Sequence, residues 1–595
     1  MFPNRQMLLI LPILIIASGA CSAASAADAP PPPCRLVPED AVMSVTLKKP
    51  KAVLHLLLRP RLIEAIESSP QYKTQAATKG FKDFRGLVKL LEQRLETDWR
   101  SIIRRLVGRG VTWAIDPRGD SLLIVDAIDG EVLKETHDLL LLVINAEAKK
   151  NGAAGAVTPI KYAGAAIWSI GPNAAHAVVG KRLILANSIP RVKAALDLMT
   201  KKDGKSLAAV PAYRKAIGDA PKAAAVTAYV NTAALKRIPA IAASLKASAN
   251  PLLALLTGPI TQALAASTHM SISLTVRNDT LTIDAISNGT APAIGPLRFA
   301  AANTPTGGAA ANLVTPRRIA AMSLHRDLQA FYASKDKLFG ERTSGLIFFE
   351  NMMGIFFTGR DLGKEVLGQT APKIRLVVAE QKYDPSEGAP SVQFPAAALV
   401  LEMKDPKKFA PILEEAWQKA IGLVNFTRGQ KAQPGLVIDR PVHRETKYTV
   451  AGFTTPGAGD PQDANVRLNV RPTLAMPGNY AILSSSETLA RDIMDALAKE
   501  SAAAPKQLAG VHSLLELSGT QLASILKANC RNLVRRNMVE KGHTLKQAQT
   551  EVDSLITLAR TMSHMTLSVG ADKARSKISL EIRLNLPSGK TGEKK

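Results

Sequence analysis

The sequence predicts an α+β protein made of two homologous tandem domains, each an antiparallel-rich sheet covered by helices. Three observations support this prediction. Several segments of the first half recur in the second half in the same order. Many short segments alternate apolar and polar residues, as half-buried strands do. Strands and helices do not follow the strict alternation that is typical of a parallel sheet.

The clearest recurring segment combines a strand with the start of a helix. Residues 179–188 read VGKRLILANS, and residues 477–486 read PGNYAILSSS. Each segment has a glycine turn, a short apolar strand and a polar step before an amphipathic helix. Ser188 and Ser486 stand where a serine side chain caps the first amides of a helix. Both segments therefore indicate the same strand–helix unit.

Other pairs of segments recur in the same order at comparable spacing. They are 90–115 with 348–379, 122–128 with 398–403, 225–231 with 512–518, and 268–274 with 563–569. The period is far too long for a solenoid. Two domains are therefore expected at 34–288 and 314–587, joined by a Gly-, Ala-, Pro- and Thr-rich linker at 289–313. The last residues, 588–595, are expected to form a disordered tail.

The N-terminus has the three parts of a bacterial-type secretory signal. A basic residue, Arg5, precedes the apolar run Met7–Ala17, and a stretch of small residues follows. This pattern predicts a signal over residues 1–26, cleaved after Ala26. The mature chain is therefore expected to be periplasmic or otherwise extracytoplasmic, with the Pro-rich residues 27–33 as an extended spacer.

Two alternatives to cleavage stay open. Cys21 follows small residues, so it is a candidate for lipidation, although the usual aliphatic residue three positions before it is Ser18. An uncleaved membrane anchor is the other alternative, because Met7–Ala27 carries no charge over about the length that spans a bilayer. Of the remaining cysteines, Cys34 and Cys530 are candidates for a disulfide, but the apolar helical stripe around Cys530 favours an ordinary core position.

The net charge of the chain is +26, and two interpretations of it stay open. It attracts an anionic partner, either a membrane surface or a cell-wall polymer, or it is only a solvated basic surface. Nucleic acid is not expected as a partner. The chain carries an export signal, and only 4% of its residues are aromatic, which leaves few side chains for stacking on bases.

Part of the sequence resembles a known group of proteins. The opening Val37-Pro38-Glu39-Asp40-Ala41-Val42, the helix-pair segment that ends near Gly108 and the strand–helix blocks resemble an uncharacterised family of exported bacterial α+β proteins. The resemblance implies a long α+β layout over most of the chain. It implies no activity, cofactor or catalytic residue.

The motifs of common enzyme classes are incomplete. Gly204-Lys205-Ser206 lacks the glycine that a phosphate-binding loop needs five residues before its GK glycine. Ser334-Lys335-Asp336-Lys337 matches SxxK, but the KTG at 590–592 lies in the charged tail, where no strand can form beside a nucleophile. The histidines do not occur at the short spacings of metal ligands. No catalytic residue, cofactor or metal is therefore predicted.

Two predicted helices carry basic faces. Lys527, Arg531 and Arg535 recur every four residues, opposite an apolar stripe, and Arg100 and Arg104 do the same on another helix. These faces are candidate surfaces for an anionic partner, or simply the solvated side of amphipathic helices. The segment 346–357, LIFFENMMGIFF, is either a partner-binding or membrane-facing patch or a core helix, and its counterpart at 90–95 favours the core.

These observations predict an exported, envelope-associated protein. Its expected role is non-enzymatic binding or scaffolding of an anionic envelope component. The alternative is an envelope hydrolase with a site formed between the two domains, so whether the protein is an enzyme stays open. The oligomeric state cannot be read from these patterns.

Overall fold

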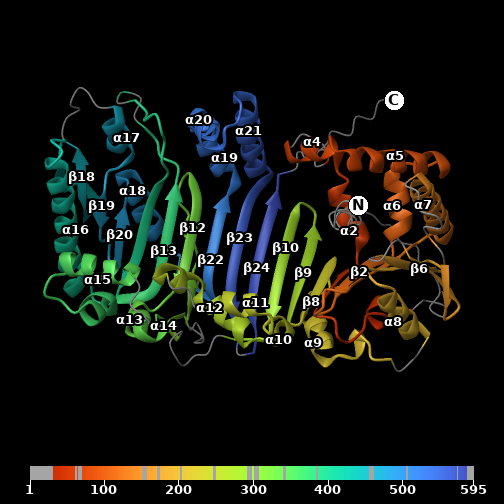
Figure 1. The fold of residues 1–595 in the computed structure, drawn as a ribbon. Helices are drawn as coiled ribbons and strands as arrows, with labels where there is room; N and C mark the ends of the chain where they lie inside the picture. The colour runs from red at the N-terminus through yellow and green to blue at the C-terminus, as the bar shows by residue number, and fades with distance from the viewer. Residues whose placement is uncertain are drawn as a thin grey trace. The chain divides into compact units, whose positions relative to one another are not determined.

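The computed structural model describes the chain from residue 31 to residue 585 with gaps (Figure 1). The described residues are 31–60, 63, 67, 70–150, 157, 159–169, 174–200, 204–245, 250–290, 298–300, 307–339, 344–383, 386, 388–453, 461–503, 507–572 and 574–585. The chain divides into two compact units. Unit 1 comprises 1–244, 267–288 and 586–595, and unit 2 comprises 245–266 and 289–585.

Unit 1 combines helices with short strands. Its described helices are η1 (Pro33–Arg35), α2 (Pro50–Leu57), α4 (Pro70–Ala76), α5 (Lys79–Arg94), α6 (Trp99–Val107), α7 (Gly130–Lys150), α8 (Ile189–Thr200), η2 (Leu207–Ala209), α9 (Pro211–Asp219), α10 (Thr232–Leu235) and α11 (Pro239–Ser244). Its described strands are β1 (Met43–Leu47), β2 (Gly110–Ile115), β3 (Ser121–Asp126), β4 (Pro159–Tyr162), β5 (Ala165–Ser169), β6 (Ala175–Val179), β7 (Arg182–Ala186), β8 (Val226–Val230), β9 (Met270–Arg277) and β10 (Thr280–Ser287).

The strands of unit 1 form an antiparallel sheet in the order β10-β9-β8-β1-β2-β3-β7-β6-β5-β4. Its main core lies on one face of this sheet. There Leu122 and Ile124 of β3 belong to one apolar cluster with Val192 and Leu196 of α8. The apolar residues of α8 recur at helical spacing, so they form one stripe that packs on the strands.

Unit 2 contains the longest described helix, α16, and the longest described strands, β13 and β23. Its described helices are α12 (Pro251–Ala266), η3 (Arg298–Ala300), α13 (Leu328–Ala333), α14 (Lys335–Leu338), α15 (Ser344–Phe356), the π-helix η4 (Leu362–Val366), η5 (Leu367–Gln369), α16 (Pro406–Gly429), α17 (Pro461–Asn469), α18 (Glu487–Ala502), α19 (Gly519–Ala528), α20 (Cys530–Lys541) and α21 (Leu545–Thr561). Its described strands are β11 (Gly308–Ala310), β12 (Arg318–His325), β13 (Thr370–Ala379), β14 (Ala396–Met403), β15 (Leu436–Asp439), β16 (Val442–His443), β17 (Thr446–Lys447), β18 (Thr449–Phe453), β19 (Thr473–Ala475), β20 (Tyr480–Ser484), β21 (Gln507–Ala509), β22 (Val511–Ser518), β23 (Met562–Ala571) and β24 (Ser576–Leu584).

The main sheet of unit 2 is also antiparallel. Its order is β24-β23-β22-β12-β13-β14-β20-β19-β18-β15, while β11 pairs with β21 and β16 pairs with β17. The two main sheets have the same strand order when β1–β3 are matched with β12–β14, β4–β7 with β15 and β18–β20, and β8–β10 with β22–β24. The α+β class and the antiparallel sheets are therefore as predicted.

The largest apolar cluster of unit 2 lies between its sheet and α18. Val377, Val400 and Ile482 point from β13, β14 and β20 toward Leu489 and Ile493 of α18. Part of the segment predicted as a linker also packs in this unit, because Phe299 of η3 is buried against Ala330 of α13. Within the described residues, no helix is both long enough and apolar enough to cross a membrane.

Three local expectations are wrong. The helix predicted through Lys527, Arg531 and Arg535 is interrupted at Asn529, which separates α19 from α20. The Asn529 side chain accepts a hydrogen bond from the amide of Gln393 and donates one to the carbonyl oxygen of the same residue. Ser486 precedes α18 as expected, but its side chain makes no capping hydrogen bond.

The segment 346–357 is the third. Core packing was favoured for it, yet within α15 Leu346 is buried, while Phe348 is 67% exposed and Ile355 is 51% exposed. A helix that is apolar on every side needs cover on every side, and here α15 has it on one side only.

Candidate functional site

One face of the unit 2 sheet is continuously apolar. The register places Leu376 of β13 opposite Met322 of β12, and Met322 opposite Leu515 of β22. Residues that are directly opposite each other in an antiparallel pair share a face. The row extends across the sheet as Leu483, Leu399, Leu376, Met322, Leu515, Leu567 and Leu580. We call this face, with its neighbouring rows, the apolar face.

A second and a third row, two residues away along each strand, extend the apolar face in the strand direction. One consists of Leu401, Ile374, Leu324, Ser513, Val569 and Ile578, and the other of Ala397, Val378, Ala320, Leu517, Met565 and Ile582. Ser513 is the polar member of these rows. Its hydroxyl accepts a hydrogen bond from Nη2 of Arg326 at 2.8 Å, so it is already partnered.

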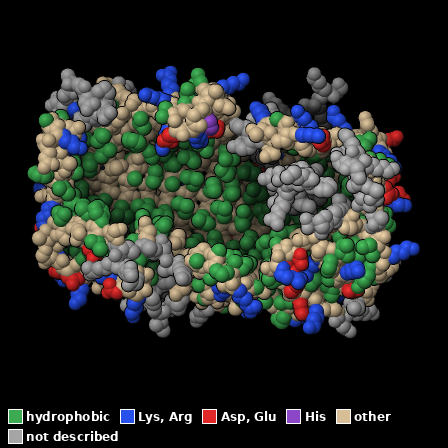
Figure 2. Space-filling model, viewed as in Figure 1, with side chains coloured by type: hydrophobic (Ala, Val, Ile, Leu, Met, Phe, Trp, Pro, Cys, Tyr) green, Lys and Arg blue, Asp and Glu red, His purple; other side chains and the backbone are tan. Residues whose placement is uncertain are grey.

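The middle of the apolar face is not covered by a described helix. Leu515 is 39% exposed, and Met322, Leu376 and Leu567 are only half-buried. Figure 1 shows α13 and α14 near one end of these strands and α19–α21 near the other end. Figure 2, in the same view, shows hydrophobic side chains lining a hollow over the strands of unit 2. Helix α16 covers the β20 end of this face, where Leu483 packs in the cluster of Trp417 and Ile421. The prediction of a sheet covered by helices therefore fails for the middle of the apolar face.

The opposite face of the same strands is mixed: it is apolar under α18 in β13, β14 and β20 and carries polar side chains elsewhere. Arg375 of β13 is buried there and forms a bidentate ion pair with Glu500 of α18, with both N–O distances at 2.7 Å. Glu516, Thr566 and Glu581 form a polar row across β22, β23 and β24 on this face. An antiparallel sheet normally turns its polar face to solvent. In unit 2 the apolar face is the one left open.

Unit 1 has the same distribution of side chains. Its register places Val226, Leu274 and Ile283 of β8, β9 and β10 in one row, and Ile283 is 36% exposed. The opposite face of β9 carries the polar residues Ser271 and Ser273, and both are buried. The helices α2 and α6 cover part of the apolar side of this sheet, and Val226 itself packs in the cluster of α2.

The predicted basic residues of unit 2 are at the surface. Lys527 lies near the end of α19, and Arg531 and Arg535 lie on α20; all three are exposed. Within the described part of the chain, no hydrogen bond or ion pair involves the side chain of any of them. Since the apolar sides of α19 and α20 pack against α21, these cations lie on the solvent side of the two helices.

The predicted basic residues of unit 1 lie on α6 and differ from each other. The Arg100 guanidinium lies 4.8 Å from the Trp99 ring centroid, so it packs on the ring, whereas Arg104 is exposed. Cys21 lies outside the described residues. Cys34 and Cys530 are free thiols, and Cys530 is half-buried beside the cluster of α19, α20 and α21, as expected.

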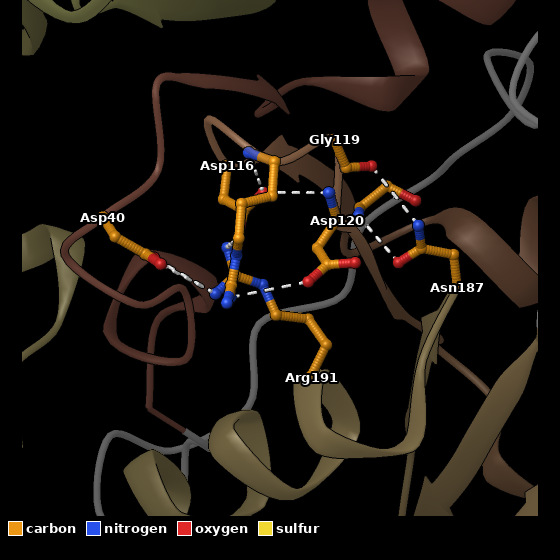
Figure 3. Close-up of polar contacts among 8 residues, drawn as sticks. Asp40, Asp116, Gly119, Asp120, Asn187 and Arg191 are labelled. Atoms are coloured by element: carbon orange, nitrogen blue, oxygen red, sulfur yellow. Dashed lines mark hydrogen bonds and ion pairs between the residues drawn. The ribbon is translucent and has the colours of Figure 1, made fainter.

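The most developed polar network of unit 1 is structural (Figure 3). The Arg191 guanidinium of α8 lies 3.1 Å from Asp40 and 3.5 Å from the buried Asp116. Burial alone disfavours the charged carboxylate of Asp116. The amides of Asp120 and Arg118 and the charge of Arg191 outweigh burial and lower the pKa of that carboxyl. Asp116 and Arg191 both bond within this network and so hold the β2–β3 turn against α8. The network therefore presents no reactive group.

A histidine pair in unit 1 is the other polar group considered as a functional site. Nε2 of His137 on α7 lies 3.0 Å from Nε2 of His176 on β6, and Trp168 packs edge-on against His137. Burial, followed by the nearby His137, lowers the pKa of His176 to about 4. Among the described residues, no group of three or more His, Cys, Asp or Glu side chains could hold a metal ion.

Sequence reasoning missed the apolar face, although a signal for it was present. In β23, Met565, Leu567 and Val569 are the apolar residues of one parity, and Thr566 and Ser568 are the polar residues of the other. Such alternation identifies the two faces of a strand. It does not say which face a distant helix will cover, and the usual assumption that the apolar side is covered is wrong here.

Comparisons with known proteins give this chain no family and only a partial structural likeness. No family model matches this chain, and no curated protein matches it by sequence. Solved structures of TP0453 share a partial likeness. Crystal form III has a TM-score of 0.25 at 12% identity, covering 46% of this chain and 86% of TP0453, and crystal form I has a TM-score of 0.24 at 12% identity, covering 46% and 84%. A TM-score of this size carries no conclusion about function, and membership of the uncharacterised exported family stays a prediction.

Proposed function

We propose that this protein is an exported, envelope-associated protein that binds an anionic, acyl-chain-bearing lipid without catalysing a reaction. The observation that carries the proposal is the apolar face of unit 2, whose central row stays partly exposed at Met322, Leu376, Leu515 and Leu567. Contiguous exposed apolar surface is costly in water and is typical of interaction sites.

Acyl chains fit this face better than a protein partner does. The rows consist of Leu, Ile, Val, Met and Ala, with Ser513 as an already bonded exception and no aromatic or charged member. Protein interfaces typically concentrate Tyr, Trp and Arg at their centres and need polar partners. An aliphatic surface without free polar groups matches the chemistry of lipid tails.

The charge of the protein favours an anionic headgroup. Lys527, Arg531 and Arg535 are exposed on α19 and α20, at one end of the strands that form the apolar face (Figure 1). Cations beside an apolar surface attract anionic lipid and add to the effect of burying the tails. This arrangement supports the interpretation of the +26 charge as functional rather than only solvating.

We also propose that the two units arose by duplication and that both use this design. Their main sheets have the same strand order, and in both units the second strand of that order carries a residue of an apolar row, Leu274 in β9 and Leu567 in β23. The hydrolase alternative, with a site formed between the two domains, stays a prediction.

The test is lipid binding by the purified mature chain and by variants of β23. Wild-type protein is delipidated with detergent and mixed with phosphatidylglycerol, and bound lipid is counted by native mass spectrometry. Leu567→Asp places a charge in the middle of the apolar face at a half-buried position. We expect it to lower the bound lipid at least about fivefold, since the charge would have to be desolvated.

Ser568→Asp is the matched control, because Ser568 is the next residue of β23 and lies on the opposite face. Circular dichroism must show that both variants fold. Equal lipid binding by wild type and Leu567→Asp, or an equal loss in Ser568→Asp, would overturn the proposal.

A further inference from the structure

The connection between β13 and β14 contains a short segment, 391–394, that asparagine side chains hold from two sides. We call this segment the brace. On one side lies α17, where the Asn469 side chain accepts from the amide of Phe394 at 2.8 Å and donates to the carbonyl oxygen of Val392 at 2.7 Å. Asn465 of the same helix accepts from the amide of Val392 at 3.0 Å. Asn469 is buried, so the brace is anchored to α17.

On its other side the brace contacts the junction of α19 and α20. The Asn529 side chain accepts from the amide of Gln393 at 2.9 Å and donates to its carbonyl oxygen at 2.8 Å. It also donates to the carbonyl oxygen of Ile525 in α19 at 3.0 Å. Asn532 of α20 donates to the carbonyl oxygen of Ser391 at 2.6 Å. These bonds join the brace to the end of α19 and to the first turn of α20.

The exposed cations of α20 lie next to these contacts. Arg531 stands between Asn529 and Asn532 in the sequence, and Arg535 follows about one turn later. The apolar side of α20 packs against α21, while the brace holds the start of the helix. The residues of the brace, Ser-Val-Gln-Phe, are uncharged. Any effect of the brace on an anionic partner must therefore act through the position of the cations.

We propose that the brace is a positioning element: through Asn529 and Asn532 it holds α20 so that Arg531 and Arg535 bind one anionic headgroup together. This inference rests on the proposed function and adds how its cationic surface is held in place. Residues four apart on a helix are neighbours, with about 5–6 Å between their Cβ atoms, so two guanidiniums there can reach one phosphate.

Positioned cations and diffuse charge predict different behaviour. Cations that are held in place before binding lose less conformational freedom than the same cations on a mobile helix, so they bind more tightly. Diffuse attraction to a charged surface depends on the charge alone. Loss of the brace contacts at unchanged charge therefore weakens binding only if the brace positions the cations.

The experiment is co-sedimentation of the full mature chain with phosphatidylglycerol vesicles at low salt. Asn529→Ala with Asn532→Ala, the brace variant, removes the contacts with the brace and keeps every charge. We expect at least about fivefold weaker binding and faster hydrogen–deuterium exchange of the α20 amides. Asn537→Ala is the matched control, because Asn537 lies on the same helix but bonds Glu551 of α21, and it should bind as wild type does. Binding or exchange in the brace variant that equals wild type would overturn the proposal.

A double-mutant cycle separates positioning from general support of the fold. Arg531→Gln with Arg535→Gln removes the cations. If the brace acts through them, adding the brace substitutions to this variant should weaken binding by less than about twofold more. A further loss as large as the loss in the wild-type background would overturn the proposal, because the brace would then act elsewhere.

Two further measurements keep the outcome clear. If circular dichroism shows that the brace variant does not fold, Asn532→Ala alone removes one exposed bond, and it should weaken binding at least about twofold. Unchanged binding by the brace variant, together with loss of lipid in Leu567→Asp, would overturn the brace and leave the proposed function standing. Wild-type protein that binds no phosphatidylglycerol would overturn the proposed function and this inference with it.

Discussion

Nε of Arg326 donates a hydrogen bond to the carbonyl oxygen of Leu255 at 2.8 Å, and this bond joins the end of β12 to α12. Arg326 is completely buried, and its other nitrogens bond the carbonyl oxygens of His325, Leu256 and His512 and the hydroxyl of Ser513. Burial lowers the pKa of this guanidinium to about 10, so it stays charged at neutral pH. Backbone carbonyls solvate the charge in place of water.

Arg326→Met should destabilise unit 2 strongly. The methionine fills much of the volume but leaves several buried carbonyl oxygens without a donor, and each such group costs about 1–3 kcal/mol. We expect a loss of at least about 3 kcal/mol in the free energy of unfolding, measured by urea denaturation. Arg440→Met, which breaks an exposed pair with Glu414, is the control and should cost less than about 1 kcal/mol. Equal losses in the two variants would contradict this assignment.

Arg375 and Glu500 should be energetically coupled. Both N–O distances are 2.7 Å, Arg375 is buried on β13, and the pair joins that strand to α18. Removing either partner leaves the other poorly solvated, so each of Arg375→Met and Glu500→Gln should cost about 3 kcal/mol. The double variant should cost less than the sum, with a coupling energy above about 1 kcal/mol in a double-mutant cycle. Additive effects would show that the pair contributes no interaction of its own.

The alternation of apolar and polar residues predicted where many strands lie. The segment 268–274 forms most of β9, and the segment 563–569 lies within β23. Alternation is a local property of the backbone, so it can be read from neighbouring residues. The same pattern assigned Leu567 and Thr566 to opposite faces of β23, which the register confirms.

Coverage of these faces could not be predicted, because it depends on helices that are distant in sequence. The helix α18 covers the side with Val377 and Ile482 and leaves the side with Leu376 open. Likewise, the bond from Arg326 to Leu255 spans residues 71 positions apart, and no spacing in the sequence announces it. The exposed Phe348 of α15 shows the same limit, since the comparison with the segment 90–95 favours the core and does not say which helices cover α15.

The stability of unit 1 should fall in mild acid because of His176. Burial and the neighbouring His137 lower the pKa of His176 to about 4, whereas in the unfolded chain it is near 6.5. Between these values the unfolded chain binds more protons than the folded chain. The free energy of unfolding should therefore fall as the pH falls from 6.5 to 4, by at most about 1.4 kcal/mol per pH unit.

Urea denaturation at pH 7.5, 5.5 and 4.5 measures this slope. His176→Gln should flatten it, and His55→Gln, at an exposed position of α2, should leave it unchanged. A slope in His176→Gln that equals the wild-type slope would mean that other groups cause the acid sensitivity.

The exposed cations of α20 should direct binding to anionic membranes. Arg531→Glu with Arg535→Glu changes the net charge from +26 to +22, and Lys407→Glu with Lys431→Glu on and beside α16 makes the same change elsewhere. In co-sedimentation with phosphatidylglycerol vesicles at low salt, the α20 variant should lose at least about fivefold in affinity and the control much less. The difference should vanish near 1 M salt, where the screening length is about 3 Å. Equal losses in both variants would mean that net charge alone attracts the protein, and no loss in either would mean that these cations only keep it solvated.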